Sequence, residues 1–254
     1  MEKKGGAMRK IFDITGQDRE HFLQGLVSND LRRLAEGPVY AALLTPQGKY
    51  LADFFLIARG DTILLDIDAT LAEATLRRLA MYRLRADVAI APSALSVFCG
   101  TGPAPEGALT DPRHPALGWR LYGDRDGDDG SDWDALRVNH LIPATGIELT
   151  PETYILEAGF ERLNGVDFRK GCYVGQEVTA RMKHKTELRK GLVQLAISGA
   201  APVGTAIEAG GKVVGTLYTQ SGGKALAQLR LDALEGPMTA GDARLRAAEA
   251  ITKA

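Results

Sequence analysis

Apolar and polar residues alternate along this chain in a pattern typical of a protein built mainly from short β-strands. Short apolar runs bounded by Gly, Pro, Asn or Asp are the pattern that strands leave in a sequence. Residues 45–48 (Thr-Pro-Gln-Gly) have the composition of a turn, so the runs on either side of them predict a hairpin. Strands are predicted at residues 11–15, 39–44, 50–58, 63–67, 88–91, 95–99 and 116–122.

Three segments carry helix signals instead. Residues 70–83 place apolar side chains at helical spacing. Residues 18–24 predict a short helix that ends at Gly25, since glycine commonly follows a helix C-terminus. Ser131 has the position of an N-cap, and Asp134 completes a capping-box pattern. The third helix is therefore expected to begin after Ser131 and to end near residue 141.

The pattern changes after Gly191. Short β-rich runs at residues 192–197, 213–219 and 225–231 alternate with glycine turns, which predicts a small sheet or barrel. The glycine pairs at 210–211 and 222–223 lie between such runs and fit hairpin turns better than phosphate loops. A domain boundary is expected near residues 186–190.

Composition and charge narrow the function classes. The chain has 254 residues, 45% hydrophobic and 25% charged, and a formal net charge of -1. That charge provides no global field toward nucleic acid or an anionic membrane, and no apolar run is long enough to span a bilayer. With Cys99 and Cys172 as its two cysteines, the chain fits a reducing compartment, so we predict a cytoplasmic protein, or a mitochondrial matrix protein if the source is eukaryotic. Met8 is an alternative start, with residues 1–7 as an extension.

The sequence contains no pattern that matches a known metal-binding motif. Asp124, Asp126 and Asp128 imitate the start of a calcium loop, but Asp129 stands where the loop needs glycine and Ala135 where it needs glutamate. The four histidines are scattered, without the spacing of metal ligands. We therefore predict no metal site.

The most informative segment surrounds Cys172. Glycines at 171 and 175 leave room around the thiol, and the nearby cations Arg169 and Lys170 favour a thiolate. The alternative is an inert, buried cysteine at a glycine-rich turn, which for a lone cysteine is the commoner case. We predict an accessible, required Cys172 and a buried, dispensable Cys99, because Cys99 ends an apolar run.

The string Lys-Gly-Cys-Tyr-Val-Gly-Gln-Glu at residues 170–177 resembles the signature of the YgfZ family of folate-binding proteins. Residues 22–30, 46–49, 202–205 and 211–215 also resemble blocks of that family. The family is similar to the T-protein of glycine cleavage, a tetrahydrofolate-dependent aminomethyltransferase. The resemblance implies an α+β fold around a central folate pocket, with a T-protein-like region at residues 8–188 and a small antiparallel C-terminal β-barrel at 189–250.

By that resemblance, the protein is an accessory factor for assembly or repair of iron–sulfur clusters that binds tetrahydrofolate or a derivative. The implied partners are folate and iron–sulfur proteins, with effects on cluster-dependent enzymes such as tRNA-modifying ones. No nucleic acid or membrane is expected to bind, and the expected state is a monomer. The implied reactive residues are Cys172 and Lys170, and the implied folate-binding residues are Asp53, Arg137, Asn139, Glu157, Gln176, Glu177 and Arg181.

A folate-dependent aminomethyl or other one-carbon transferase is the alternative function. Two positions argue against it. T-proteins carry an acidic pair where this chain reads Ala52-Asp53, and a pterin-holding glutamate where it has Asn139. An amide can bond a pterin edge, but it lacks the charge of a carboxylate.

A basic run follows the motif. Its cations are Arg181, Lys183, Lys185, Arg189 and Lys190, opposed by a glutamate at position 187. A solvated surface strip is one interpretation. The other is an anion site for the glutamate tail of folate. RNA backbone is a third ligand, but the run has no aromatic residue for base stacking.

Overall fold

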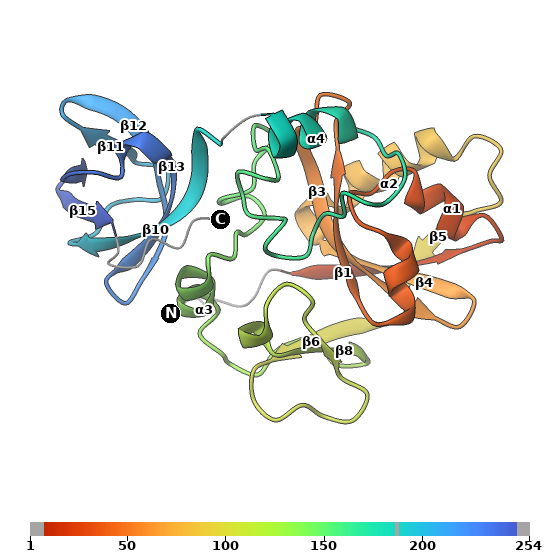
Figure 1. The fold of residues 1–254 in the computed structure, drawn as a ribbon. Helices are drawn as coiled ribbons and strands as arrows, with labels where there is room; N and C mark the ends of the chain where they lie inside the picture. Colours follow the sequence, from red (N-terminus) through yellow and green to blue (C-terminus); the bar gives the residue numbers. More distant parts are fainter. Residues whose placement is uncertain (1–7, 186–187, 248–254) are drawn as a thin grey trace. The chain divides into compact units, whose positions relative to one another are not determined.

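The computed structural model describes residues 8–185 and 188–247. Within these residues the chain forms two compact units (Figure 1). The first unit contains the described residues up to Ser131 together with Leu163–Gln176. The second unit contains Asp132–Arg162 and the described residues from Glu177 onward. The residues 1–7 that we interpreted as an extension, and part of the expected boundary at 186–190, lie outside the described residues.

The first unit is built on an antiparallel sheet in the order β2-β3-β4-β1-β5. Five of the predicted strands form it, and the predicted turn at residues 45–48 joins the first hairpin. Every residue of β2 is buried, and β3 and β4 are nearly so, which explains their continuous apolar sequence. The strands are β1 (Arg9–Thr15), β2 (Val39–Leu44), β3 (Tyr50–Arg59), β4 (Thr62–Asp68) and β5 (Ala89–Pro92).

Helical segments complete the hydrophobic core of this sheet. Helix α2 (Ala69–Arg83) begins at its N-cap Asp68, whose carboxylate accepts the Thr70 N–H at 2.9 Å. Helix α1 (Arg19–Gln24) buries Phe22 and Leu23 in the same core. The 3-10 turn η1 (Leu31–Ala35) follows α1. Both predicted helices in this part of the chain are confirmed.

A second sheet in the first unit has the order β7-β8-β6-β9. It contains β6 (Ser96–Gly100), β7 (Leu109–Thr110), β8 (Trp119–Gly123) and β9 (Gly127–Asp128), with β9 parallel to β6. The prediction that one strand covers 116–122 is wrong at its start. Pro115–Leu117 forms a 3-10 turn there, since proline suits the first position of a helical turn.

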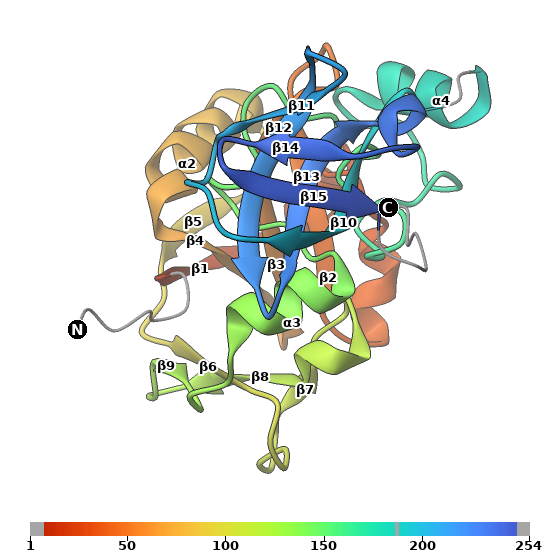
Figure 2. The ribbon, with the colours of Figure 1, turned by 90° about the vertical axis from the view of Figure 1, so that its left-hand side faces the viewer.

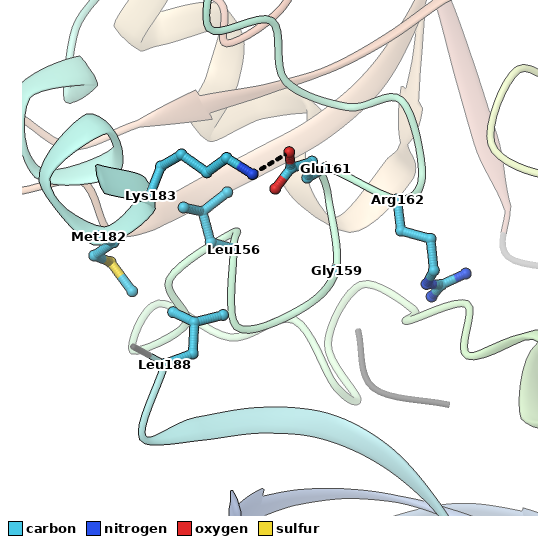
Figure 3. Close-up of a pocket in the computed structure, with 7 residues that line it drawn as sticks. All are labelled: Leu156, Gly159, Glu161, Arg162, Met182, Lys183 and Leu188. Carbon is cyan, nitrogen blue, oxygen red and sulfur yellow. Dashed lines mark hydrogen bonds and ion pairs between the residues drawn. The ribbon is translucent and has the colours of Figure 1, made fainter. Parts of the chain in front are cut away.

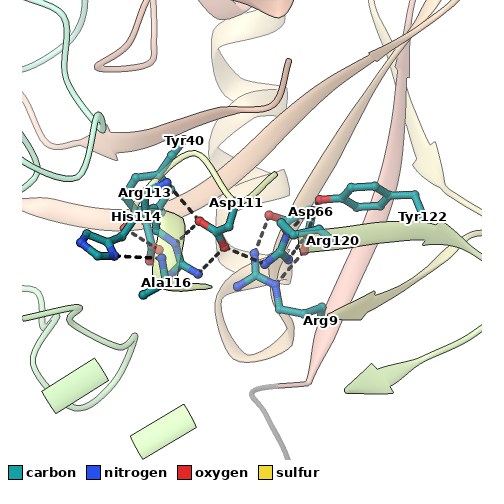
Figure 4. Close-up of polar contacts among 10 residues, drawn as sticks. Arg9, Tyr40, Asp66, Asp111, Arg113, His114, Ala116, Arg120 and Tyr122 are labelled. Atoms are coloured by element: carbon teal, nitrogen blue, oxygen red, sulfur yellow. Dashed lines mark hydrogen bonds and ion pairs between the residues drawn. The ribbon is translucent and has the colours of Figure 1, made fainter. Parts of the chain in front are cut away.

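Buried charges connect the two sheets of the first unit (Figure 4). Asp66 on β4 has no exposed surface, and it accepts hydrogen bonds from Arg9 at 2.7 Å, from Tyr122 at 2.8 Å and from Arg120 on β8. Burial alone would raise the pKa of Asp66, but the Arg120 and Arg9 guanidinium groups outweigh it and lower that pKa to about 2. The Arg120 guanidinium also lies 3.9 Å from the ring centre of Phe55 on β3.

The second unit contains α3 (Trp133–His140), most of α4 (Gln176–Lys185) and a closed antiparallel barrel (Figure 2). The prediction of Ser131 as helix cap is wrong. Asp132 is the N-cap of α3, and its carboxylate accepts the Ala135 N–H at 3.0 Å. The Ser131 hydroxyl instead donates to Asp129 at 2.6 Å.

The barrel has the strand order β10-β13-β12-β11-β14-β15. Three of its strands are those predicted from the sequence, and the short β11, β14 and β15 were missed. The glycine pairs at 210–211 and 222–223 have positive φ and join consecutive strands, as predicted for hairpin turns. The strands are β10 (Lys190–Ser198), β11 (Ala206–Ala209), β12 (Lys212–Ser221), β13 (Lys224–Arg230), β14 (Met238–Ala240) and β15 (Ala243–Ala247).

No helix within residues 8–185 and 188–247 is long and apolar enough to cross a membrane. The same residues contain no cluster of three or more His, Cys, Asp or Glu side chains that could hold a metal ion.

Candidate functional site

The Cys172 motif lies on an irregular loop that belongs to the first unit up to Gln176. The loop is fixed upstream of the cysteine at Asp167. The Asp167 N–H donates to the Ser28 carbonyl at 3.0 Å. Its carboxylate accepts the backbone N–H groups of Arg169 at 2.7 Å and Lys170 at 3.2 Å. An aspartate that bonds the backbone two and three residues ahead forms a local turn.

Lys170 is turned into the protein, with 4% of its surface exposed. Its ammonium donates to the backbone carbonyls of Gln24, at 2.8 Å, and Val27. The Tyr173 ring centre lies 4.9 Å from the same nitrogen. Burial lowers the pKa of Lys170 to about 8, although the charge of Asp30 acts in the opposite direction. These contacts indicate a structural function for Lys170. They do not support its predicted catalytic role, which stays a prediction.

The loop is fixed again downstream of the cysteine. Tyr173 is buried, and Val174 packs against the main core of the first unit. Gly175 has a φ of +85°, and a Cβ atom there would lie 2.6 Å from the Thr45 carbonyl oxygen and 2.9 Å from the Leu44 Cβ. Glycine is therefore required at 175 because the loop approaches the β2–β3 turn at backbone distance.

Cys172 lies between these two anchors and is exposed, as predicted. The preceding Gly171 is also exposed, and a Cβ atom there would meet no described atom within 4 Å. Cys99 on β6 is half-buried rather than fully buried, so that prediction is wrong in degree. Burial raises the pKa of the Cys99 thiol. The two cysteines therefore differ in environment as the sequence suggested, and Cys172 is the more accessible thiol.

Asp53 on β3 is buried, with 5% of its surface exposed. Each of its carboxylate oxygens accepts a tyrosine hydroxyl, from Tyr50 at 2.5 Å and Tyr40 at 3.0 Å. Sequence reasoning found Asp53 but missed both tyrosines. Tyr40 lies on the neighbouring strand β2, so its place beside Asp53 becomes visible only when β2 and β3 pair, whereas Tyr50 lies three residues before Asp53 on β3 itself.

Arg137 and Asn139, predicted to bind folate, both lie on α3 in the second unit. The Arg137 guanidinium bonds the buried Glu148 carboxylate at 3.2 Å and the Thr219 hydroxyl at 3.1 Å. It also pairs with Asp134 at 2.8 Å. The exposed Asn139 accepts a hydrogen bond from the Lys224 ammonium at 2.9 Å. Sequence reasoning missed Glu148, which fixes α3 to barrel strand β12.

The remaining predicted folate residues are dispersed. Glu157 accepts a hydrogen bond from Gln228 on β13 at 3.3 Å, and its carbonyl accepts the Leu192 N–H at 2.7 Å. The sequence did not predict α4, which carries Gln176, Glu177 and Arg181. The first unit thus holds Asp53, Lys170, Cys172 and Gln176, and the second unit holds Arg137, Asn139, Glu157, Glu177 and Arg181.

Part of the basic run borders a pocket in the second unit (Figure 3). The pocket has a volume of about 340 Å³ and a partly apolar wall that includes Leu156, Met182 and Leu188. Lys183 lines it and forms an ion pair with Glu161 at 2.5 Å. A carboxylate ligand would therefore compete with Glu161 for this cation. The side chain of Lys185 lies outside the described residues.

Comparison with known proteins identifies the family. The chain is 31% identical to the human mitochondrial iron–sulfur cluster assembly factor IBA57 over 276 residues, covering 91% of this chain and 78% of the human protein. The mouse protein of the same name is 29% identical over 280 residues, with the same coverage. This chain belongs to the IBA57 family of iron–sulfur cluster assembly factors. Within the chain, residues 189–250 match the family model of the CAF17 C-terminal β-barrel domain.

The IBA57-family chain also has the fold of a known aminomethyltransferase. Its structure matches the crystal structure of the glycine cleavage system aminomethyltransferase T from Bartonella henselae with a TM-score of 0.75. The match covers 96% of this chain and 84% of that one, at 14% sequence identity. At this identity the likeness concerns the fold alone. The predicted α+β fold with a C-terminal antiparallel barrel is confirmed, and so is the predicted class of iron–sulfur cluster assembly factor. The relatives carry the name IBA57 rather than YgfZ.

Proposed function

We propose that this IBA57-family protein assists cluster assembly by lending the Cys172 thiolate as a temporary ligand to an iron–sulfur cluster that passes between other proteins. The observation that carries the proposal is the exposure of Cys172 on a loop fixed on both sides of it. Exposure gives a cluster access, and the fixed loop reduces the conformational entropy lost when the thiolate binds. The clients we propose are cluster-dependent enzymes, including tRNA-modifying ones.

The chemical step is a ligand exchange at iron. The Cys172 thiol gives its proton to solvent, its sulfur bonds an iron atom, and the thiolate that held that iron leaves and is protonated. No electron is transferred. Protein-bound clusters commonly have four protein ligands, and Cys172 supplies one. The remaining ligands therefore come from partner proteins, which makes the complex transient.

Folate binding is the second part of the proposal. The YgfZ-like motif and the aminomethyltransferase fold support a reduced folate, tetrahydrofolate or a derivative, as ligand. The candidate contacts stay predictions for each unit by itself, with Asp53 and Gln176 in the first unit and Arg137, Asn139, Glu157, Glu177 and Arg181 in the second. One-carbon transfer is the less favoured function, because both oxygens of Asp53 already accept tyrosine hydroxyls and position 52 lacks the second acid.

The mitochondrial names of the relatives support the matrix as the setting if the source is eukaryotic, and the cytoplasm otherwise. Both compartments keep thiols reduced, which the thiolate role of Cys172 requires.

The test compares Cys172→Ser with Cys99→Ser in cells that lack the endogenous assembly factor. We expect Cys172→Ser to lose the activity of cluster-dependent enzymes and Cys99→Ser to retain it, at equal amounts of folded protein. Full activity of Cys172→Ser would refute the thiolate role. Calorimetry with tetrahydrofolate and its formyl derivative tests the folate part separately, and the absence of binding heat at high protein concentration would remove it.

A further inference from the structure

The ammonium of Lys170 is held in an unusual way for a buried charge. Within residues 8–185 and 188–247, its partners are two backbone carbonyl dipoles and an aromatic ring rather than a carboxylate at salt-bridge distance. A buried lysine loses the solvation of its charge, and here that cost lowers the pKa to about 8. The side chain stays in place because the carbonyls of Gln24 and Val27 and the ring of Tyr173 replace water around it.

These contacts connect the Cys172 loop to a rigid part of the first unit. Gln24 is the last residue of α1, and Val27 is fully buried and forms a β-bridge to Leu43 of β2. The lysine is two residues from the cysteine in the sequence. Its side chain therefore anchors the backbone immediately before Cys172 to the core of the unit.

We propose that Lys170 is the positioning residue of Cys172: its ammonium holds the loop against α1 so that the thiol is presented in one fixed orientation. The proposal rests on the proposed role of Cys172 and replaces a catalytic role for Lys170. Lys170 acts through the backbone of residues 170–172, not on the reacting sulfur. The carbonyls it binds accept hydrogen bonds but cannot take part in ligand exchange.

The groups around the Lys170 ammonium suit a lysine side chain in particular. The ammonium has three N–H donors, two carbonyls accept from it, and the ring of Tyr173 faces the same charge. Methionine at 170 keeps the stem but has no donor. Glutamine has an amide donor on a shorter stem, so it is expected to restore part of the anchor.

The experiment places a nitroxide spin label on Cys172 of the full chain in a Cys99→Ser background. For the otherwise unchanged protein we expect a spectrum of intermediate mobility, because the exposed label keeps its own rotation while the anchored backbone restricts it. For Lys170→Met we expect a correlation time shorter by about threefold, since loop motion on the nanosecond scale dominates such spectra. Lys170→Gln should fall between the two, and it keeps the test valid if Lys170→Met does not fold.

Arg162→Met is the matched control. Arg162 is also a cation that donates to two backbone carbonyls, those of His140 at 3.0 Å and Leu141 at 2.6 Å, but it belongs to the second unit. Its loss should lower the thermal stability without changing the label at Cys172. A purely structural role for Lys170 predicts equal behaviour of the two variants, whereas positioning predicts a spectral change for Lys170→Met alone.

Support of cluster enzymes in cells completes the test. Lys170→Met should lower it by about tenfold or more at equal folded protein, since a misplacement of about 1 Å of a reacting group can cost about a hundredfold. An unchanged spectrum, or a mobile label with full cluster support, would overturn the positioning role while leaving the Cys172 proposal intact. Failure of the proposed function would appear differently, as full cluster support by Cys172→Ser.

Discussion

Alanine at position 175 should release the downstream anchor of the Cys172 loop. Gly175 has a φ of +85°, a region that costs a residue with a Cβ atom about 1–2 kcal/mol. Its new Cβ would also lie 2.6 Å from the Thr45 carbonyl oxygen and 2.9 Å from the Leu44 Cβ. Leu44 is buried in β2, and the Thr45 carbonyl is held in the β2–β3 turn by the Gly48 N–H at 2.8 Å, so we expect the loop rather than the sheet to move.

The size of the effect follows from these two contributions. Overpacking of a tight site typically costs about 1–3 kcal/mol. Added to the backbone strain, Gly175→Ala should lower the free energy of unfolding of the first unit by about 2–5 kcal/mol. If the loop moves away from Thr45 and Leu44, the free energy of unfolding falls by less than this. In that case the position of Cys172 changes.

Gly171→Ala is the control on the other side of the cysteine. A Cβ at 171 meets no described atom within 4 Å, so this variant should stay within about 0.5 kcal/mol of the parent. Urea unfolding of the full chain measures both variants, and the activity of cluster enzymes in cells measures the consequence for function. Equal stability and equal cluster support for the two alanine variants would refute the reasoning about the downstream anchor.

Three further outcomes are expected. Iodoacetamide at neutral pH should modify the exposed Cys172 well before the half-buried Cys99, and mass spectrometry of the folded protein would show the order. Because the pKa of Asp66 is lowered from 3.8 to about 2 on folding, its stabilisation of about 2 kcal/mol is present above pH 4 and lost as the pH falls toward 2. Asp66→Asn should remove that pH dependence and cost about 3 kcal/mol in thermal or urea unfolding, because among the described residues the buried Arg120 then keeps only Asp111 at 3.5 Å as a carboxylate partner and the half-buried Arg9 loses its own. Lys183→Ala should weaken a pentaglutamate folate more than the monoglutamate in calorimetry, with a difference that shrinks at high salt, and equal losses would exclude a tail contact.

Local patterns in the sequence were enough to predict most of the regular structure. Each strand of the main sheet and three barrel strands could be predicted, because an apolar run bounded by turn residues is a local pattern that is visible in the sequence itself. The barrel strands β11, β14 and β15 lack such a run, because their sequences (AIEA, MTA and ARLRA) mix one or two apolar residues with small or charged ones. The N-cap of α3 was misplaced by one residue because Ser131 and Asp132 are both good caps, and Asp129 binds the serine hydroxyl in the folded protein.

In the candidate site, too, the sequence predicted some features and the tertiary structure decided others. The sequence alone pointed to Cys172, because the eight-residue motif is specific and its glycines leave room around a thiol. Only the tertiary structure decided what the neighbours of that cysteine do. The sequence placed Lys170 beside the thiol as a reactive residue, and the fold shows that its ammonium donates to carbonyls 146 and 143 residues away in the chain, which is why we propose an anchor. How deeply a side chain is buried, which groups it bonds and how closely two backbone segments approach all depend on segments that meet only after folding. The local sequence pattern does not show which segments those are.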